Sequence, residues 1–319
     1  MHEAARFTIL GSGFGLYGYL PALLNLGRAV ALPQRYKPVL GGRSELLQFM
    51  PSVDWCEDAD AALARSNAAI VALRPADQAR WVSRLAQMQK IRTLILEKPV
   101  APTPELSASL LDELARAGKH YRIGYTFRLL PWAQQLRATL GGDADGISLD
   151  WTFLAHHYRN DLANWKRFDA EGGGALRFYG IHLVALLAEL GYDDVSTSTL
   201  WQPSDAETQR WEATFTGPAL CPFTVNVDSR AGAVLFRIAV KSGEQVQEAL
   251  VDQPDPFSAE HATSPQGQDI RVGVLERLCR SLEEADEAHA ELQRAIVRLW
   301  ARIEGVSGRR STMVQPTAF

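Results

Sequence analysis

Residues 6–18 read RFTILGSGFGLYG, and the fold that we predict for the chain follows chiefly from this segment. The apolar run Arg6–Leu10 is typical of a buried strand, and a glycine-rich segment follows it directly. Gly11 and Gly13 fit the first two positions of the GxGxxG pattern. The first glycine makes a tight turn, and the second lets backbone N–H groups approach a pyrophosphate. The stretch therefore predicts a dinucleotide-binding loop between a first strand and a first helix.

The third glycine of the pattern is missing from this loop. Leu16 stands at that position, and Gly15 or Gly18 would have to relieve the packing of the helix against the strand instead. Phe14 and Gly15 complete the predicted cofactor-binding loop. A glycine-rich turn in a βα unit that binds no nucleotide remains the alternative.

The first third of the chain alternates short apolar runs with segments of helical period, which predicts βαβ units and a parallel sheet. The further strands expected here are Tyr36–Leu40, Ala68–Leu73, Thr93–Leu96 and Arg122–Gly124. Helices are expected at Ala76–Gln89 and Glu105–Gly118.

After about residue 124 the chain changes to runs in which apolar and polar residues alternate, as in strands with one buried face. These runs are Ile147–Ala155, Val195–Trp201, Trp211–Thr216, Phe223–Asp228, Val234–Lys241 and Val246–Val251. Helices are expected at Pro131–Leu140, Ala175–Leu190 and, as one long segment, Ile270–Ile303. We predict an α/β protein with a Rossmann doubly wound parallel sheet in residues 1–123. Residues 124–319 are expected to form an α+β domain with an open, mostly antiparallel sheet.

The composition limits the classes of function. The chain has 319 residues, 33 basic and 37 acidic side chains and a net charge of −4, so no strongly basic face for nucleic acid is required. No apolar run approaches the length of a membrane span, and the N-terminus lacks a signal-peptide pattern. Cys56, Cys221 and Cys279 show no ligand spacing, and His156 and His157 are expected on opposite faces of a strand. We therefore expect a soluble, cytoplasmic protein without a metal site.

The segment after the expected second strand bears on the choice of cofactor. An NAD site usually has an acidic residue at this point, but the chain has Gly41-Gly42-Arg43-Ser44. Arg43 and Ser44 would suit a ribose 2′-phosphate, so we predict that NADP(H) is preferred and that NAD(H) remains possible. The alternative is that Arg43 is a solvated surface residue.

Four further blocks have a recognisable order and spacing. They are residues 20–23 (LPAL), 97–100 (EKPV), 124–128 (GYTFR) and 172–182, which begin GGGAL and end GIH. With the glycine loop, these blocks resemble the glucose–fructose oxidoreductase/inositol dehydrogenase (Gfo/Idh/MocA) family. The resemblance implies a sugar, cyclitol or nucleotide-sugar substrate held between a nicotinamide and the second domain's sheet. It also implies a homodimer or homotetramer formed through that sheet.

The resemblance places Lys98 in the active site, in contact with the reacting hydroxyl. Hydride transfer at a carbinol or carbonyl needs a proton donor or acceptor at the same oxygen, and a lysine can serve. A structural ion pair with Glu97 is the alternative role for Lys98. The predicted cofactor-binding set also includes Leu73, Pro75, Glu97 and Lys98.

The second family motif departs from its usual form. The family usually has an aspartate where this chain has Phe178, whereas the histidine is kept as His182. Phe178 cannot orient a hydroxyl or accept a proton, so Lys98 becomes the expected proton donor. Tyr179 offers a substitute phenol beside the altered position.

The predicted catalytic residues are therefore Lys98, His182 and Tyr179, and the predicted substrate-contacting residues are Arg128, Trp165, Lys166, Phe178 and His182. His182 could instead be a structural histidine on an apolar helix. The altered motif leaves two hypotheses, an NADP(H)-dependent oxidoreductase with a rearranged site or a cofactor-binding protein of the same fold with a non-redox or regulatory role.

Overall fold

The computed structural model describes residues 5–140, 144–242, 245–261, 267–284 and 287–312. The chain divides into two compact units. Unit 1 comprises Met1–Ala101, Leu106–Leu129 and Phe257–Glu291, and unit 2 comprises Pro102–Glu105, Leu130–Pro256 and Leu292–Phe319. The predicted domains 1–123 and 124–319 are continuous, whereas these units interleave along the chain, because a late segment belongs to unit 1.

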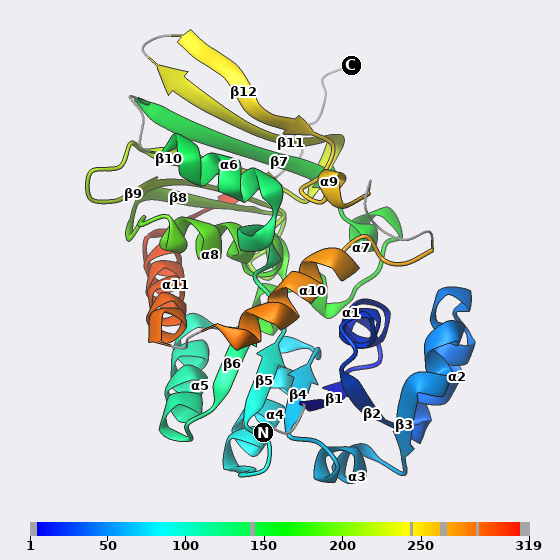
Figure 1. Cartoon of the computed structure of the whole chain (residues 1–319). Helices are drawn as coiled ribbons and strands as arrows, with labels where there is room; N and C mark the ends of the chain where they lie inside the picture. Colours follow the sequence, from blue (N-terminus) through cyan, green and yellow to red (C-terminus); the bar gives the residue numbers. More distant parts are fainter. Residues whose placement is uncertain (1–4, 141–143, 243–244, 262–266, 285–286, 313–319) are drawn as a thin grey trace. The chain divides into compact units, whose positions relative to one another are not determined.

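Sheet A, in unit 1, has six parallel strands in the order β3-β2-β1-β4-β5-β6 (Figure 1). This is the order of a doubly wound Rossmann sheet, which reverses between β1 and β4. The strands are β1 (Arg6–Leu10), β2 (Ala29–Pro33), β3 (Val53–Cys56), β4 (Ala68–Val71), β5 (Thr93–Leu96) and β6 (His120–Ile123). Every residue of β4 is buried, as expected of a central parallel strand. The predicted parallel sheet is confirmed.

The predicted second strand at Tyr36–Leu40 is wrong. The second strand is β2, and the chain is helical after it, first as a 3₁₀ turn (Gln34–Tyr36) and then as α2 (Lys37–Gly41). Pro38 lies in the first turn of α2, where its missing N–H has no cost, whereas in a central strand it would remove a ladder hydrogen bond. The strand β3 was not predicted.

Unit 1 also contains helices, several of which share a buried core with sheet A. The helices are α1 (Leu20–Asn25), α2, α3 (Ala59–Ala64), α4 (Pro75–Gln87), α9 (Ser258–His261) and α10 (Val272–Arg280). Two more, α5 (Pro104–Arg116) and α11 (Glu287–Val306), have residues in both units. Leu275 of α10 belongs to the same buried cluster as Ile9 of β1 and Leu23 of α1, and α10 lies beside α1 (Figure 1). The late segment therefore completes the core of unit 1.

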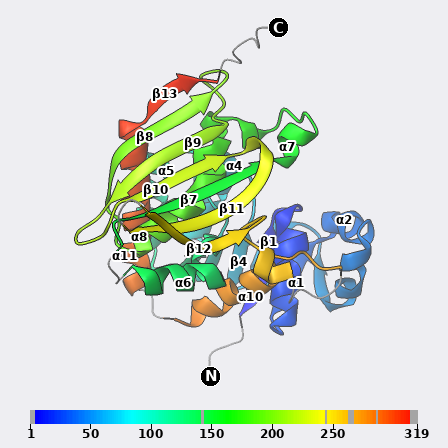
Figure 2. The same ribbon diagram turned by 90° about the horizontal axis from the view of Figure 1, so that it is seen from above.

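Sheet B, in unit 2, has seven strands in the order β12-β11-β7-β10-β9-β8-β13 (Figure 2). Only the pairs β7/β10 and β8/β13 are parallel among the described strands, so the predicted mostly antiparallel sheet is confirmed. The strands are β7 (Gly146–Leu154), β8 (Asp194–Gln202), β9 (Arg210–Thr216), β10 (Phe223–Asp228), β11 (Arg230–Ser242), β12 (Gln245–Gln253) and β13 (Gly308–Ser311). Along β10, buried residues alternate with partly exposed ones, which gives the sheet one core face.

The other helical segments of unit 2 are α6 (Pro131–Thr139), α7 (His156–Arg159), two 3₁₀ turns (Trp165–Arg167 and Asp169–Glu171), a π-helical stretch (Ala175–Gly180) and α8 (Ile181–Glu189). The expected single helix Ile270–Ile303 is instead divided. Within the described residues it comprises α10, a 3₁₀ turn (Ser281–Glu283) and α11. No helix in the described ranges is both long and apolar enough to cross a membrane.

Candidate functional site

The glycine loop leaves the carboxyl end of β1 with Gly11. This residue has φ +128°, and a Cβ atom at this position would lie 2.2 Å from the carbonyl oxygen of Ala72. A side chain is therefore excluded by both the backbone conformation and the backbone of Ala72, the residue that follows β4. The Gly11 N–H donates a hydrogen bond to the Tyr36 hydroxyl at 3.0 Å, which ties the loop to the segment after β2.

Gly13 differs from Gly11 because a Cβ atom there would have no neighbour within 4 Å. The helix that follows begins with a π-helical turn, Gly15–Tyr19, and continues as α1. An open approach to the backbone beside a helix N-terminus suits a diphosphate, because unpaired N–H groups and the helix dipole both favour an anion. The loop therefore fits the diphosphate of a dinucleotide.

The residues that follow β2 differ from those expected at this position. Because β2 ends at Pro33, the residues at its carboxyl end are Gln34 and Arg35, both exposed. Arg43 follows α2, where its guanidinium group lies 4.8 Å from the centre of the Tyr17 ring and its Nη1 atom lies 3.3 Å from Glu45 Oε1. The premise that Arg43 and Ser44 follow the second strand is wrong.

Two cavities open near the predicted cofactor residues of unit 1. One, of about 270 Å³, is lined by Leu73 and, on α4, by Asp77, Arg80, Trp81 and Arg84. It lies where the chain leaves β4 and enters α4, close in sequence to Pro75. The second, of about 180 Å³, is lined by residues that include Tyr17, Arg43 and Asp269. The first cavity adjoins the strand ends at which open α/β sheets bind ligands.

The segment carrying Lys98 follows β5 and is fixed by Gln78 of α4. The Gln78 amide nitrogen donates to the carbonyl oxygens of Glu97 at 2.5 Å, Pro99 at 3.1 Å and Val100 at 3.1 Å. Its amide oxygen accepts from the Glu97 N–H at 3.0 Å. Gln78 is fully buried. These bonds hold the backbone on both sides of Lys98, which is itself partly buried.

The Glu97 carboxyl group lies between Lys98 and the first helix. Its Oε1 accepts a hydrogen bond from the Tyr19 hydroxyl at 2.5 Å, and its Oε2 accepts one from the Lys98 N–H at 3.3 Å. Burial raises the pKa of Glu97, and the charge of Lys98 and the Tyr19 hydrogen bond offset part of this rise. Burial and Glu97 likewise raise the pKa of Tyr19, so the phenol stays protonated as a donor.

Arg128, the remaining predicted site residue of unit 1, lies in a 3₁₀ turn (Thr126–Leu129) shortly after β6. It is partly buried. Its position after the carboxyl end of β6 is on the ligand-binding edge of a parallel sheet.

The predicted site residues of unit 2 include a half-buried aromatic cluster. The Phe178 ring meets Trp165 edge-on at a centroid distance of 5.2 Å and Tyr179 at 4.7 Å. Lys166 Nζ lies 5.2 Å from the centre of the Phe178 ring, and Tyr179 packs against Phe153 at 4.8 Å. The structure thus brings Trp165, Lys166, Phe178 and Tyr179 together.

His182 and Tyr179 are the predicted catalytic side chains of this region. His182 lies in the first turn of α8 and is 8% exposed. Burial raises the pKa of Tyr179, so its phenol is neutral at ordinary pH and can donate a hydrogen bond. The aromatic cluster, rather than a carboxylate, surrounds the position at which the family usually has aspartate.

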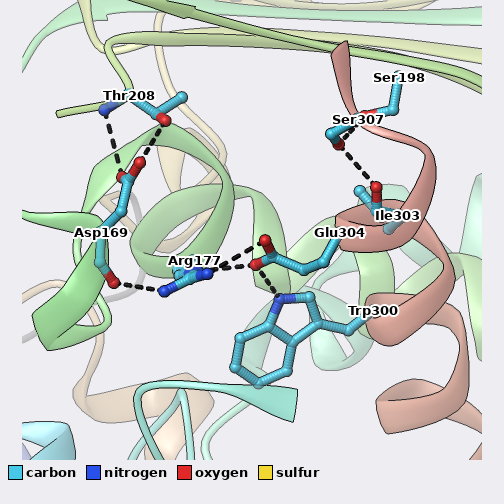
Figure 3. Close-up of polar contacts among 8 residues, drawn as sticks. All are labelled: Asp169, Arg177, Ser198, Thr208, Trp300, Ile303, Glu304 and Ser307. Atoms are coloured by element: carbon cyan, nitrogen blue, oxygen red, sulfur yellow. Dashed lines mark hydrogen bonds and ion pairs between the residues drawn. The ribbon is translucent and has the colours of Figure 1, made fainter. Parts of the chain in front are cut away.

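Arg177, next to Phe178, is held in a structural network. Its Nε and Nη2 atoms donate to Glu304 at 2.7 and 3.1 Å, and its Nη1 donates to the Asp169 carbonyl oxygen at 2.6 Å (Figure 3). The Asp169 carboxylate in turn accepts from the Thr208 hydroxyl at 2.6 Å. Burial alone would lower the pKa of Arg177, but Glu304 raises it above its ordinary value. Arg177 therefore anchors the glycine-rich turn to α11.

No metal-ligating cluster of His, Cys, Asp or Glu occurs among the residues that the structure describes. The expectation that His156 and His157 lie on a strand is wrong, because both lie in the short helix α7. His156 is exposed and His157 is buried, so the two side chains lie in different environments.

His157 makes the stability of the protein dependent on pH. Burial lowers its pKa to about 4, and the positive charges of Lys166 and Arg167 act in the same direction. An unfolded histidine titrates near 6.5, so between about pH 6.5 and 4 the unfolded state binds a proton that the folded state does not. Stability from this group is therefore present above pH 6.5 and is lost as the pH falls, by about 3 kcal/mol in all.

We expect His157→Gln to remove this contribution to acid sensitivity. Urea unfolding of wild type and variant at pH 7 and pH 4.5 should show a smaller loss of unfolding free energy in the variant. His156→Gln is the matched control, because His156 is the exposed neighbour. Equal losses in wild type and His157→Gln would contradict the prediction.

Comparisons with known proteins place the fold. The chain matches no protein-family model and no curated protein. It does match solved structures over nearly its whole length. KijD10, a 3-ketoreductase from Actinomadura kijaniata in complex with NADP and TDP-benzene, has a TM-score of 0.69 at 13% identity, covering 97% of this chain and 99% of that chain.

Two further solved structures have comparable TM-scores. GenD2 from gentamicin A biosynthesis, in complex with NAD, has a TM-score of 0.70 at 17% identity, covering 96% of this chain and 95% of that one. The WlbA dehydrogenase from Thermus thermophilus, in complex with NAD and UDP-GlcNAcA, has a TM-score of 0.68 at 17% identity, covering 96% of each chain. At these identities the likeness establishes the fold. The fold implied by the Gfo/Idh/MocA resemblance is confirmed.

Sequence reasoning missed several residues of the candidate site. Gln78 and Tyr19 were not expected to contact the Lys98 segment, and their partner Glu97 lies 19 and 78 residues away along the chain. No local pattern marks such contacts. Arg35 could have been found from Pro38, because a proline at that point argues against a central strand.

Proposed function

We propose that this chain is an NADP(H)-dependent oxidoreductase of the Gfo/Idh/MocA type. It would transfer a hydride to or from a hydroxyl or keto carbon of a sugar, cyclitol or nucleotide-sugar-like substrate. One observation carries the proposal. The glycine loop follows β1 and Lys98 follows β5, and these parallel strands are separated in sheet A by β4 alone. The predicted cofactor loop and the predicted proton donor therefore leave the same edge of one sheet.

In this proposal the nicotinamide, when bound, supplies the hydride. The loop Gly11–Gly15 holds the diphosphate, with Leu73, Pro75 and Glu97 in the cofactor-binding set. The Lys98 ammonium donates a proton to the substrate oxygen during reduction, and the neutral Lys98 amine accepts a proton from the substrate hydroxyl during oxidation.

The remaining predicted residues act on the substrate. His182 and Tyr179 supply hydrogen bonds to polar groups, and Trp165 and Phe178 offer apolar ring faces. Arg128 and Lys166 supply positive charge. The nucleotide-linked ligands TDP-benzene and UDP-GlcNAcA in structures of the same fold support a nucleotide sugar as the substrate.

The experiment that tests the function separates binding from turnover. Fluorescence titration measures the affinity for NADPH and NADH, and absorbance at the reduced nicotinamide band follows oxidation in the presence of keto sugars and nucleotide keto sugars. We expect binding and turnover with a member of this panel. Cofactor binding without turnover would favour the alternative, a cofactor-binding protein with a non-redox or regulatory role. Absence of binding would overturn both.

We propose Arg35, rather than Arg43, as the contact for the 2′-phosphate, because β2 ends at Pro33. Arg35 follows β2 directly, and no carboxylate lies in the segment Gln34–Tyr36 to repel a phosphate. We expect Arg35→Ala to weaken NADPH binding about tenfold and to leave NADH binding within about twofold, because only NADPH carries the phosphate. Arg43→Ala is the matched variant. A larger loss for Arg43→Ala would restore the original assignment, and tighter binding of NADH to wild type would overturn the NADP(H) preference.

The same proposal includes a homodimer or homotetramer formed through sheet B. The face of this sheet seen in Figure 2 is not covered by the described helices of unit 2. It carries a ladder of polar side chains, in which Arg210 donates to Asn226 at 3.0 Å and Asn226 donates to Asp150 at 3.1 Å. Light scattering of the purified protein measures its mass, and a monomer would contradict the proposal. The cytoplasmic location stays a prediction.

A further inference from the structure

One polar network joins the first helix of unit 1 to the Lys98 segment. Tyr19 belongs to the π-helical turn that follows the glycine loop, and it is fully buried. Its hydroxyl donates to Glu97 Oε1 at 2.5 Å, and Glu97 Oε2 accepts the Lys98 N–H at 3.3 Å. Gly124 packs closely against this pair. A Cβ atom at position 124 would lie 2.8 Å from Glu97 Oε1 and 3.0 Å from the Tyr19 hydroxyl, so there is no room for a side chain. The carboxyl group thus has one defined place.

We propose that Tyr19 and Glu97 are positioning residues that hold Lys98 in place and keep a negative charge beside its amine. The inference rests on the proposed function, in which Lys98 moves a proton. Gln78 holds the backbone through the carbonyl groups of Glu97, Pro99 and Val100, and the Glu97 side chain adds one bond to the turn, from the Lys98 N–H. The carboxyl group also links Lys98 to the helix that carries the cofactor loop.

The charges around Glu97 favour this role. Burial raises the pKa of Glu97 overall, and the charge of Lys98, the hydrogen bond from Tyr19 and the charge of Arg271 offset part of this rise. The pKa of Tyr19 is raised by burial and by Glu97, and to a smaller extent it is raised by Cys279 and lowered by Arg271. Arg271 is itself held by Asp269 through two hydrogen bonds of 2.8 Å. Removing the Tyr19 hydroxyl withdraws a donor from the carboxylate, and Glu97→Gln removes the charge altogether.

The test measures the Lys98 amine directly and needs no substrate. The whole protein is labelled with trinitrobenzenesulfonate across a range of pH, and peptide mass spectrometry follows Lys98 and, as an internal reference, the exposed Lys90. The variants are Tyr19→Phe and Glu97→Gln. Tyr125→Phe is the matched control, because Tyr125 is a buried tyrosine of unit 1 outside this network. Circular dichroism confirms folding, and fluorescence titration measures NADPH affinity.

We expect Glu97→Gln to move the pH of half-maximal Lys98 labelling down by about one unit, because an amine loses its proton more readily without a nearby negative charge. Tyr19→Phe should move it in the same direction by less, and Lys90 should not change in any variant. If Glu97→Gln does not fold, Tyr19→Phe decides the matter. An unchanged Lys98 profile in the folded variants would overturn the proposal. A shifted profile in a protein that reduces no carbonyl compound would uphold the positioning role and reject the proposed function.

Discussion

The Lys98→Met variant is expected to bind NADPH as wild type does and to reduce its carbonyl substrate about a hundredfold to ten-thousandfold more slowly. Methionine keeps an unbranched side chain that is shorter by the amine nitrogen, and it has no proton to donate. Gln78 holds the backbone on both sides of Lys98 through the carbonyl groups of Glu97, Pro99 and Val100, and these bonds do not involve the lysine amine. The turn should therefore keep its shape in the variant.

Stopped-flow measurement of the hydride-transfer step compares wild type with Lys98→Met at saturating NADPH. Lys90→Met is the matched control, because Lys90 is an exposed lysine of the same unit. A rate within about threefold of wild type would reject Lys98 as the proton donor and leave His182 and Tyr179 as the candidates. Loss of NADPH binding together with activity would favour the structural role, an ion pair between Lys98 and Glu97.

The parts of the site that could be predicted are those specified by neighbouring residues. The segment RFTIL followed by glycines predicts the loop by itself, because the strand, the turn and the start of the helix are consecutive in the sequence. The same is true of TLIL followed by Glu97 and Lys98. Sheet B was also predictable, because alternation along each strand reports which face is buried, as β10 shows.

The parts that could not be predicted depend on partners distant along the chain. Gln78 and Tyr19 reach Glu97 from two different helices, and no spacing rule connects them. The interleaving of the units has the same origin, since Leu275 completes a core built mainly from residues near the N-terminus. The wrong second strand has a different cause. The apolar pair Val39-Leu40 suits a strand as well as a helix, and Pro38 beside it suits only the first turn of a helix.

Gly11→Ala and Gly13→Ala are expected to separate the stability of the glycine loop from its binding of a cofactor. At Gly11 an added methyl group would meet the Ala72 carbonyl oxygen at 2.2 Å, with φ at +128°. Backbone strain and overpacking together should lower the free energy of unfolding by about 3 kcal/mol or more. At Gly13 nothing lies within 4 Å and φ is not in the positive range, so alanine should leave stability unchanged or raise it by less than about 1 kcal/mol.

Gly13→Ala, which should not lower stability, should nevertheless weaken NADPH binding. The Gly13→Ala methyl group would occupy the open side of the loop, where the diphosphate is proposed to approach, so NADPH affinity should fall about tenfold or more in a protein of normal stability. Urea unfolding and fluorescence titration of both variants check this. If Gly13→Ala bound NADPH as wild type does, the open side of the loop would not be the diphosphate site. The glycine-rich turn would then be a structural feature of the βα unit, in which only Gly11 has to be glycine.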